Sequence, residues 1–574
     1  MRKESTKYIK SIFLAVLTTM LLVSCGGGGG GGGMVSFSNN SELHNGGDAG
    51  GWGGSGGGNN TSNSSVTGSL SSGAGTFTPP NDIDWSSIKL TITVTSDGTT
   101  TTHTLLNTET EAIAELLTSL KRGDVVEVTA DITMVDDDPR TTSSGAVTIG
   151  VGDNHISLPT PYKFSCSMEM TRNMYEDYGC SNTPSDASVS GIQTGIYTVN
   201  NASSVIPPDA SGTGFIFDHW ETVPDGQIYV PGSSRGDVVI SPVFKPDYSV
   251  AYTDLVDTIV ITEQSEFNTL MSTHAAQNFS GKEIKLYSNV STSTGFTNTT
   301  DGFQGTFDGN GYTANVTLSG STETIFGFCC KLANGAEIKN LTIAGSVTYT
   351  GSNADVGAFA GTAEGNITNC KNRAVVSTTG NNSGLSTGGI VGNVDDASVI
   401  SGCSNYSSIN GGGMHTGGIA AYCRGIIEQS FNKGNILAHR TGESHVGGIT
   451  GSLMGSNSVI NSYNTGNIHS MYGSNSCAGG VVGFVNTDGN IQNCFEYNSI
   501  VQSDSSSDAY KIGYVIDASI SDVYSSSPSN AFNGTVSVSA GTINDAKTQL
   551  PTNNPTIWEL KPGAAYPTLV NNPE

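Results

Sequence analysis

Charged side chains are scarce in this chain, since only 13% of its 574 residues are Asp, Glu, Lys or Arg. Basic residues are the rarest of them, and 24 Lys and Arg against 50 Asp and Glu give a formal net charge of −26 at pH 7. Nucleic-acid binding needs clustered Lys and Arg, so this balance argues against a nucleic-acid partner. Gly, Ser, Thr and Asn are abundant instead, as in extracellular proteins rich in β-structure and turns.

Long apolar runs are absent except near the N-terminus. Residues 11–23 are mostly apolar and follow a basic stretch that contains Arg2, Lys3, Lys7 and Lys10. The run is too short for a transmembrane helix. This pattern indicates a secretory signal peptide over residues 1–24. Such peptides have a basic segment, then a short apolar segment, and then a small residue before the cleavage site.

The end of this segment, Leu22-Val23-Ser24-Cys25, resembles the lipobox of bacterial lipoproteins. The resemblance implies cleavage before Cys25 and a diacylglycerol group on its thiol. We therefore expect the protein to be attached to a membrane through this lipid anchor. Each buried methylene contributes about 0.8 kcal/mol, which makes two or three acyl chains a firm anchor. The alternative is an ordinary secretory signal with a chance cysteine. The expected location is the outer membrane, lipid-anchored and facing the cell surface. The alternative is a periplasmic orientation, because glycines follow Cys25 where surface-exported lipoproteins of the Bacteroides group often carry acidic residues.

Three segments precede the repeat region. Residues 25–80 are rich in Gly, Ser and Asn, a composition that cannot bury enough apolar surface to fold and so predicts a flexible tether. Residues 81–161 form a predicted small β-rich domain, because Ile88–Val94 alternates in polarity, with one helix over Glu109–Leu120.

Residues 162–250 form the predicted third segment. Here Gly214–Trp220, followed by Tyr229–Gly232, is similar to the internalin-type β-grasp repeat of bacterial surface proteins. That resemblance implies a spacer or adhesive module without catalytic residues. We expect Trp220 in its core.

From Leu341 onward one pattern recurs about every 30 residues, and self-similarity at such a period indicates a solenoid or a propeller. A small or apolar residue is followed six positions later by a β-branched one, in the pairs Leu341/Val347, Cys370/Val376, Cys403/Ile409, Ser430/Ile436, Ser462/Ile468 and Cys494/Ile500. Three positions before each pair stands an aliphatic residue: Ile338, Ile367, Ile400, Ile427, Val459 or Ile491. Glycine-rich phrases such as Gly388–Gly392 and Gly447–Gly451 separate the repeats.

These positions predict a parallel β-helix. They carry β-branched residues and Gly, whereas helical repeats carry Leu and Ala at helical spacing, and a propeller usually needs longer repeats. Stacked coils place like residues over like and bury one continuous column. One position is occupied by Asn372, Asn405, Asn432 and Asn464. We expect these residues at left-handed corners, stacked in a hydrogen-bonded ladder.

The repeats resemble the GLUG repeat of bacterial surface proteins. Gln264–Gln277 looks like that family's lead-in helix, Phe303–Gly311 like its first coil, and Trp558–Leu569 like its terminal cap. The resemblance implies a mainly β protein with a right-handed parallel β-helix over residues 259–574. The expected function is a surface adhesin or binding protein that presents the β-helix to an extracellular glycan or protein ligand.

The alternative is a polysaccharide-degrading lyase or hydrolase, since such enzymes also use β-helices. Their clustered carboxylates are not predicted here, because Asp395, Asp396, Glu428 and Glu443 occupy different repeat positions. Recognisable nucleophile, metalloprotease and phosphate-loop motifs are absent as well. The sequence therefore predicts no catalytic residue and no cofactor.

Two further groups of side chains are candidate sites. His415, His445 and Cys477 occupy one repeat position, and stacked His and Cys side chains are plausible zinc ligands. The alternative, a turn position with single polar residues in solvent, leads us to expect no metal. Nine cysteines remain besides Cys25, so they cannot all pair. The disulfide candidates are Cys166 with Cys180 and, in neighbouring coils, Cys370 with Cys403.

Overall fold

The computed structural model describes residues 35–36, 64–71, 88–106, 109–133, 139–150, 152–159, 161–166, 172–180, 182–183, 195–198, 209–210, 213–230, 238–471, 476–486, 488–503, 508–516, 518–533 and 539–574. The chain divides into two units, Met1–Thr171 with Gly191–Pro208 and His219–Pro242, and Arg172–Ser190 with Asp209–Asp218 and Val243–Glu574. The predicted signal peptide, Cys25 and most of the predicted tether lie outside the described residues. No helix in the described ranges is long and apolar enough to span a bilayer.

The first unit contains a four-stranded antiparallel sheet, in the order β4 (Thr99–Leu106), β3 (Lys89–Ser96), β5 (Val125–Thr133) and β6 (Pro139–Thr148). Alternate residues of β3, including Leu90 and Ile92, are buried against Ile113 and Leu117 of helix α2 (Thr110–Ser119). The strand predicted at Ile88–Val94 and the helix predicted at Glu109–Leu120 are thus confirmed.

Short strands also occur on either side of this sheet in the sequence. β1 (Val35–Ser36), β2 (Ser64–Ser71) and β7 (Gly152–Pro159) form a three-stranded sheet, so β1 and β2 fall within the predicted tether. A further sheet has the order β10 (Gly195–Thr198), β8 (Pro161–Cys166), β13 (Val238–Pro246), β11 (Phe215–Thr222) and β12 (Ile228–Tyr229), with β9 (Arg172–Asn173) beside β13. Trp220 is buried there, as predicted, and pairs with Tyr229.

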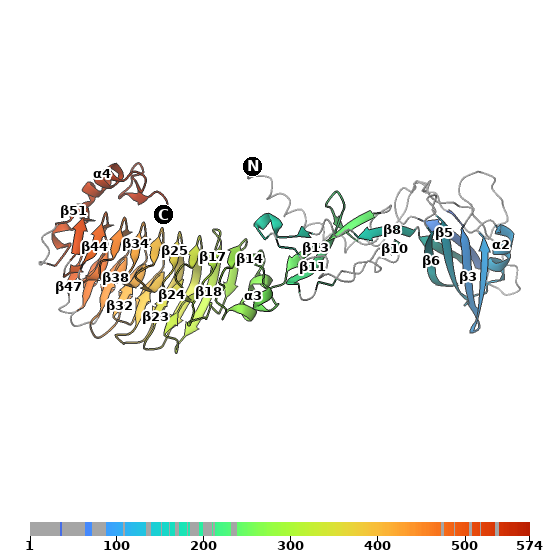
Figure 1. The fold of residues 1–574 in the computed structure, drawn as a ribbon, viewed down its shortest axis with the longest axis horizontal. Helices are drawn as coiled ribbons and strands as arrows, with labels where there is room; N and C mark the ends of the chain where they lie inside the picture. Colours follow the sequence, from blue (N-terminus) through green and yellow to red (C-terminus); the bar gives the residue numbers. More distant parts are fainter. Residues whose placement is uncertain are drawn as a thin grey trace. The chain divides into compact units, whose positions relative to one another are not determined.

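The second unit is dominated by a parallel β-helix of about seven turns, which Figure 1 shows as stacked strands from β14 onward. From Thr306 onward, each turn contributes to a ten-stranded sheet, a fourteen-stranded sheet and two seven-stranded sheets. The ten-stranded sheet consists of β14 (Thr258–Ile261), β15 (Glu283–Leu286), β17 (Thr306–Asp308), β21 (Glu337–Lys339), β25 (Asn366–Thr368), β29 (Val399–Ser401), β34 (Ile426–Glu428), β39 (Ser458–Ile460), β44 (Gly489–Gln492) and β49 (Ala518–Ser521).

The fourteen-stranded sheet begins with long strands and then divides into two rows of short ones. It consists of β16 (Val290–Thr292), β18 (Thr313–Gly320), β22 (Thr342–Tyr349) and β26 (Lys371–Thr378), then β30 (Ser404–Asn405), β35 (Phe431–Asn432), β40 (Tyr463–Asn464), β45 (Phe495–Glu496), β50 (Tyr524–Ser525) and β51 (Gly541–Thr542) in one row, and β31 (Ile409–Gly411), β36 (Ile436–Ala438), β41 (Ile468–Ser470) and β46 (Val501–Ser503) in the other.

The two seven-stranded sheets follow each other within every turn. The first consists of β19 (Ile325–Phe326), β23 (Asp355–Gly357), β27 (Ser386–Gly388), β32 (His415–Gly417), β37 (His445–Gly447), β42 (Cys477–Gly479) and β47 (Asp508–Tyr510). The second consists of β20 (Cys329–Leu332), β24 (Ala360–Ala363), β28 (Val391–Val394), β33 (Ala420–Cys423), β38 (Thr450–Leu453), β43 (Val482–Val485) and β48 (Tyr514–Val515). Glycines between them allow close backbone approach, since a Cβ at Gly418 would lie 2.2 Å from the carbonyl oxygen of Gly448.

The predicted inner columns are confirmed in register. The aliphatic column from Ile338 to Ile491 pairs strand by strand in the ten-stranded sheet and is buried. The β-branched column from Val347 to Ile468 pairs in the fourteen-stranded sheet. One member was assigned wrongly. Ile468 pairs with Val501, and Ile500 is 54% exposed.

The error at Ile500 comes from a change in the preceding corner. Glu496 pairs with Asn464, so it takes the place that Asn holds in four earlier coils. The asparagine side chain closes a short turn by bonding the backbone two residues later, whereas Glu496 reaches the hydroxyl group and the amide nitrogen of Ser499. The corner is one residue longer, which turns Ile500 outward.

The predicted asparagine ladder is confirmed. The Nδ2 atoms of Asn372, Asn405 and Asn432 donate to the Oδ1 atom of the next asparagine at 2.8, 2.7 and 2.8 Å. These residues are completely buried. The expectation that they adopt the left-handed conformation is wrong. Positive φ values occur in a different column, which includes Asn340, Asn369, Gln429, Asn461, Asn493 and Asp522.

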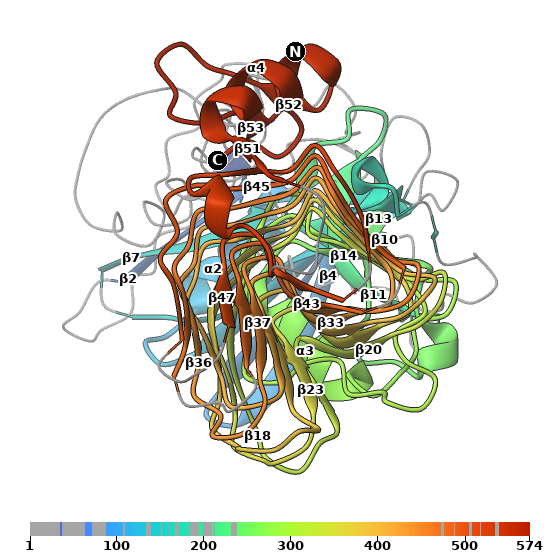
Figure 2. The same cartoon turned by 90° about the vertical axis from the view of Figure 1, so that its left-hand side faces the viewer.

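Both predicted flanking elements are present in the second unit. Helix α3 (Gln264–His274) buries Phe267, Leu270 and Met271 where the β-helix begins. Near the C-terminus, α4 (Ile543–Asn553) and the β52 (Trp558–Glu559)–β53 (Thr568–Leu569) pair share a core with Phe431, Tyr463, Phe495 and Tyr524. These elements lie to one side of the stacked coils (Figure 2). The C-terminal segment therefore covers an aromatic face of the fourteen-stranded sheet.

Candidate ligand-binding sites

Two columns of outward-facing side chains run side by side along the seven-stranded sheets. In the first sheet the column contains Asp355, Ser386, His415, His445 and Cys477. In the second it contains Lys331, Thr362, Asn393, Tyr422, Ser452, Phe484 and Tyr514. We call these two columns the outer strip. Core residues such as Val356 and Val394 occupy the alternate positions, so the outer strip faces away from the core. Four of its members, Ser386, His445, Ser452 and Cys477, are nevertheless buried.

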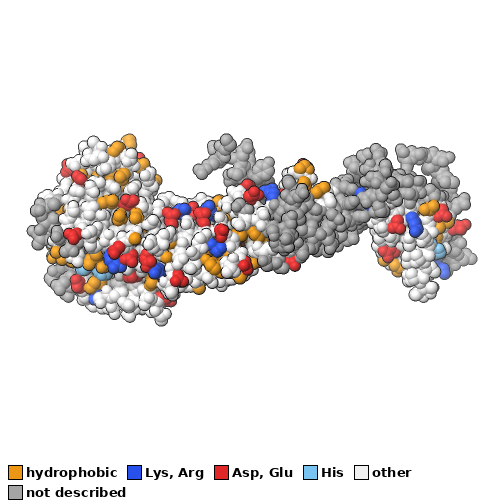
Figure 3. Space-filling view, viewed as in Figure 1, with side chains coloured by type: hydrophobic (Ala, Val, Ile, Leu, Met, Phe, Trp, Pro, Cys, Tyr) orange, Lys and Arg blue, Asp and Glu red, His pale blue; other side chains and the backbone are white. Residues whose placement is uncertain are grey.

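Aromatic rings dominate the C-terminal half of the outer strip. The His415 ring lies 4.9 Å from the Tyr422 ring, and the His445 ring stacks on Phe484 with centroids 4.3 Å apart. Phe484 in turn stacks on Tyr514 at 6.0 Å. Tyr422, Phe484 and Tyr514 are all half-buried. Figure 3 shows histidine side chains gathered on one side of the β-helix, next to acidic and basic groups.

Ser452 holds the two histidines in place. Its hydroxyl oxygen lies 2.8 Å from Nδ1 of His415 and 2.9 Å from Nδ1 of His445. A serine hydroxyl has one proton, so only one imidazole accepts it and the other must donate. Nε2 of His445 lies 3.2 Å from the Glu443 carboxylate, which assigns the proton of His445 to Nε2. His445 Nδ1 then accepts from Ser452, and His415 Nδ1–H donates to the same hydroxyl.

Burial keeps both imidazoles uncharged at neutral pH. Desolvation, with the charges of His445 and Arg440, lowers the pKa of His415 to about 3. Desolvation also lowers the pKa of His445, although the Glu443 carboxylate opposes it. In the N-terminal half of the outer strip, desolvation raises the pKa of Asp355, opposed by hydrogen bonds from Ser386, Asn393 and Thr362.

The residue types Ser452, His445 and Glu443 are those of a nucleophilic triad, and consecutive members are within hydrogen-bonding distance. Ser452, however, is completely buried, and its neighbours in the column are Tyr422 and Phe484. Its hydroxyl therefore cannot reach a substrate unless rings move. The arrangement positions imidazole rings and does not present a nucleophile.

The structure brings the three candidate zinc ligands together without forming a shared ligand set. His415 pairs with His445 and His445 with Cys477 in adjacent coils. Nδ1 of each histidine is directed at Ser452, as described above. Within the described ranges, no group of three or more His, Cys, Asp or Glu side chains is arranged to hold a metal ion.

The disulfide candidates occupy different surroundings. Cys370 and Cys403 are buried in neighbouring coils as thiols, each with its sulfur 3.4 Å from a carbonyl oxygen, of Thr368 and Ser401 respectively. Burial, with a further contribution from Cys403, raises the pKa of Cys370 well above its usual value. Cys180 is buried and accepts a hydrogen bond from Asn173 at 3.1 Å. The side chain of Cys166 and the lipidation candidate Cys25 lie outside the described residues.

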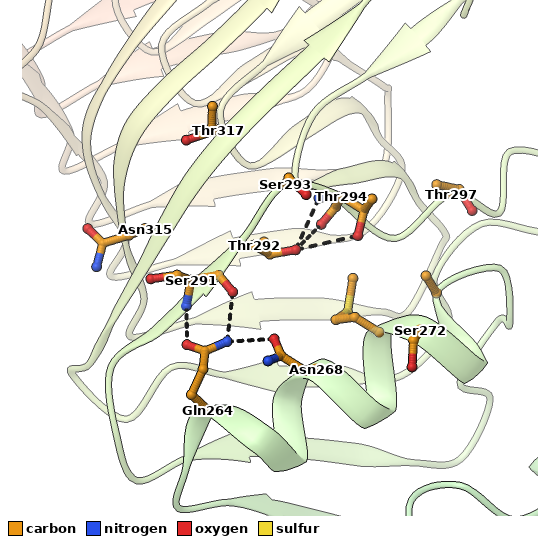
Figure 4. A pocket seen from close by; sticks show the side chains of 12 residues that line it. Gln264, Asn268, Ser272, Ser291, Thr292, Ser293, Thr294, Thr297, Asn315 and Thr317 are labelled. Atoms are coloured by element: carbon orange, nitrogen blue, oxygen red, sulfur yellow. Dashed lines mark hydrogen bonds between the residues drawn. The ribbon is translucent and has the colours of Figure 1, made fainter.

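An open pocket of about 870 Å³ lies beside α3, where the β-helix begins. Figure 4 shows Gln264 of α3 bonded to Ser291 and to Asn268, with Asn315 and Thr317 on the neighbouring strand β18. The twelve lining residues are Gln264, Asn268, Met271, Ser272, Ala275, Ser291, Thr292, Ser293, Thr294, Thr297, Asn315 and Thr317, and none of them is ionisable. The sequence reasoning missed this pocket because all of its residues precede Leu341, where the recurring pattern was first recognised.

Fold and surface together define a parallel β-solenoid protein with small antiparallel β-domains upstream. No protein-family model matches this sequence, and no curated protein matches it. The chain is similar to the crystal structure of a "putative immunoglobulin A1 protease" from Bacteroides ovatus, with a TM-score of 0.38 and 18% sequence identity. The match covers 57% of this chain and 95% of that chain.

Proposed function

We propose that this protein is a GLUG-type lipoprotein of the cell envelope that binds an extended extracellular glycan along the outer strip. The observation that carries the proposal is the series of half-buried rings at Tyr422, Phe484 and Tyr514, which face away from the core. Exposed apolar and aromatic surface of this kind marks interaction sites. The apolar faces of sugar rings pack on aromatic faces, while sugar hydroxyl groups bond polar neighbours.

The geometry of the outer strip suits a long ligand. Successive coils repeat about every 4.8 Å, so an extended chain that follows the columns meets a new side chain at each step. Thr362 and Asn393, in the same column as the rings, supply hydrogen-bonding groups. The net charge of −26 disfavours acidic ligands and supports a neutral glycan.

A polysaccharide-degrading activity finds less support. Asp395 and Asp396 line one small pocket with Glu364, where Arg424 pairs with both aspartates. Glu428 and Glu443 lie elsewhere, bonded to Ser401 and His445 respectively. Catalysis needs titratable groups held together in a cleft. We therefore expect the purified chain to release no reducing sugar or unsaturated product from a polysaccharide panel.

The test is an array of neutral and acidic polysaccharides and matrix proteins, probed with the purified chain. Tyr422→Ala and Phe484→Ala should each weaken binding about tenfold or more, because ring anchors dominate such interfaces. Val375→Ala, at an exposed position of β26 outside the outer strip, is the control and should change affinity by less than about threefold. Unchanged glycan binding by both ring variants would refute the outer strip as the ligand site. Binding to a matrix protein alone would replace the glycan with a protein ligand.

A further inference from the structure

The pocket beside α3 originates in an incomplete first coil. β16 pairs with β18 only from Val290 to Thr292, although β18 continues to Gly320. The chain then turns away from β18, and Phe296 pairs with Cys329 of the second seven-stranded sheet. The first coil thereby omits a strand in the first seven-stranded sheet, which starts at β19. In the part of the chain that the structure describes, no strand pairs with residues 317–320 on this side.

This path depends on Gly295. A Cβ at that position would lie 2.4 Å from the carbonyl oxygen of Phe328 and 2.6 Å from that of Gly327. Only glycine lets the backbone pass so close to the next coil. The omitted strand leaves a recess bounded by the edge of β18, the segment 291–297 and α3.

The walls of the recess are preorganised. The Gln264 side chain donates to Asn268 Oδ1 at 2.8 Å and to the Ser291 carbonyl oxygen at 2.9 Å, and it accepts from the Ser291 amide at 2.7 Å. Thr292 donates to the carbonyl oxygen of Thr294 at 2.7 Å, which fixes the turn. Fixed walls lower the entropy cost of binding a ligand.

Several hydrogen-bonding groups are left for a ligand. Asn268 uses its oxygen for Gln264, so its Nδ2 donors remain. Ser293, Thr297, Asn315 and Thr317 are exposed, and their side chains have no hydrogen-bond partner among the described residues. Met271 and Ala275 add apolar surface.

We infer that this pocket is a second binding site, for an uncharged saccharide of about two to four sugar residues, a size that its volume can hold. A charged ligand would be desolvated without a counter-charge, because no lining residue is ionisable. An extended peptide is disfavoured, since the unpaired edge covers only residues 317–320 and the lining offers no separate apolar pockets for its side chains. The inference is independent of ligand binding at the outer strip.

The test uses the full chain and isothermal titration with neutral gluco-, manno-, xylo- and galacto-oligosaccharides, alongside acidic oligogalacturonates. Thr317→Trp places a large ring in part of the pocket from an exposed position and should weaken neutral-saccharide binding at least about tenfold. Asn268→Ala removes a donor and should weaken it less. Ser319→Trp is the matched control, because Ser319 is exposed on the same face of β18 but does not line the pocket.

The outcomes separate the two sites. Retained oligosaccharide binding by Tyr422→Ala together with loss by Thr317→Trp supports the pocket, whether or not the outer strip binds glycan. Loss in Tyr422→Ala with no change in Thr317→Trp overturns the pocket inference and places the ligand on the outer strip. Preference for oligogalacturonates, binding of a peptide library instead, or no binding of any neutral saccharide also overturns it.

Discussion

Replacing Asn432 by Ala tests whether the buried asparagine ladder stabilises the β-helix. The Asn432 side chain makes four hydrogen bonds: it donates to the Gly434 carbonyl and to Asn464, and it accepts from the Gly434 amide and from Asn405. Alanine makes none of them. The surrounding backbone is buried and water cannot replace the lost partner.

The expected magnitude follows from the groups that lose their partners. Asn405 keeps its bond to the Ser407 carbonyl oxygen, and Asn464 keeps its bond to the Gly466 carbonyl oxygen. The amide and carbonyl of Gly434 lose the Asn432 side chain, and an unsatisfied buried group costs about 1–3 kcal/mol. We expect a loss of about 2–6 kcal/mol. Asn410→Ala is the control, because Asn410 lies on the outer face of the same sheet and surface changes cost less than about 0.5 kcal/mol.

The assay is hydrogen exchange of the full chain followed by mass spectrometry, which measures the opening free energy of individual coils. Peptides from the coils that contain Asn405, Asn432 and Asn464 should exchange faster in Asn432→Ala, while the N-terminal sheet around β3 should be unchanged. Equal and small effects of Asn432→Ala and Asn410→Ala would refute the reasoning.

Four further predictions follow. Ile468, 1% exposed between Ile436 and Val501, should not tolerate Asp: a buried unpaired charge costs several kcal/mol, whereas Ser456→Asp, at an exposed turn, should have little effect on the urea midpoint. Cys25→Ala should abolish lipid labelling and release the protein from membranes; persistent labelling would contradict the lipobox. Purified protein should contain no stoichiometric zinc by elemental analysis, and one equivalent lost in His445→Ala would show a metal site. Between about pH 6.5 and about pH 3, His415 is protonated in the unfolded chain and neutral in the folded chain. The free energy of unfolding should therefore fall as the pH falls through this window, and it should fall less in His415→Asn.

The inner columns could be predicted from the sequence because stacking makes each position repeat. Counting from Ile338 to Ile491 was enough to align the buried strands, since each coil must place an aliphatic side chain over the previous one. Counting failed where the corner changed length. Glu496 in place of asparagine moved the next β-branched position from Ile500 to Val501.

Asparagine itself was ambiguous, because it serves two structural roles in the same coil. Its side chain forms the buried ladder at Asn432, and its backbone adopts the left-handed conformation at Asn461. Both roles are common for this residue type. Only the contacts of each side chain distinguish them.

The candidate sites could not be predicted from repeat positions alone, because they depend on contacts between different columns. His415 and Ser452 are 37 residues apart, on different sheets and in different coils. The sequence showed two histidines in one column and suggested either a metal or solvent-exposed residues. The structure shows that a serine in the other column holds both rings, and that aromatic side chains pack against them. A polar column thus becomes a rigid surface lined with rings only where the angle between two sheets places it against a second column. The repeat spacing within one column does not determine that angle, so the sequence pattern could not predict the contact.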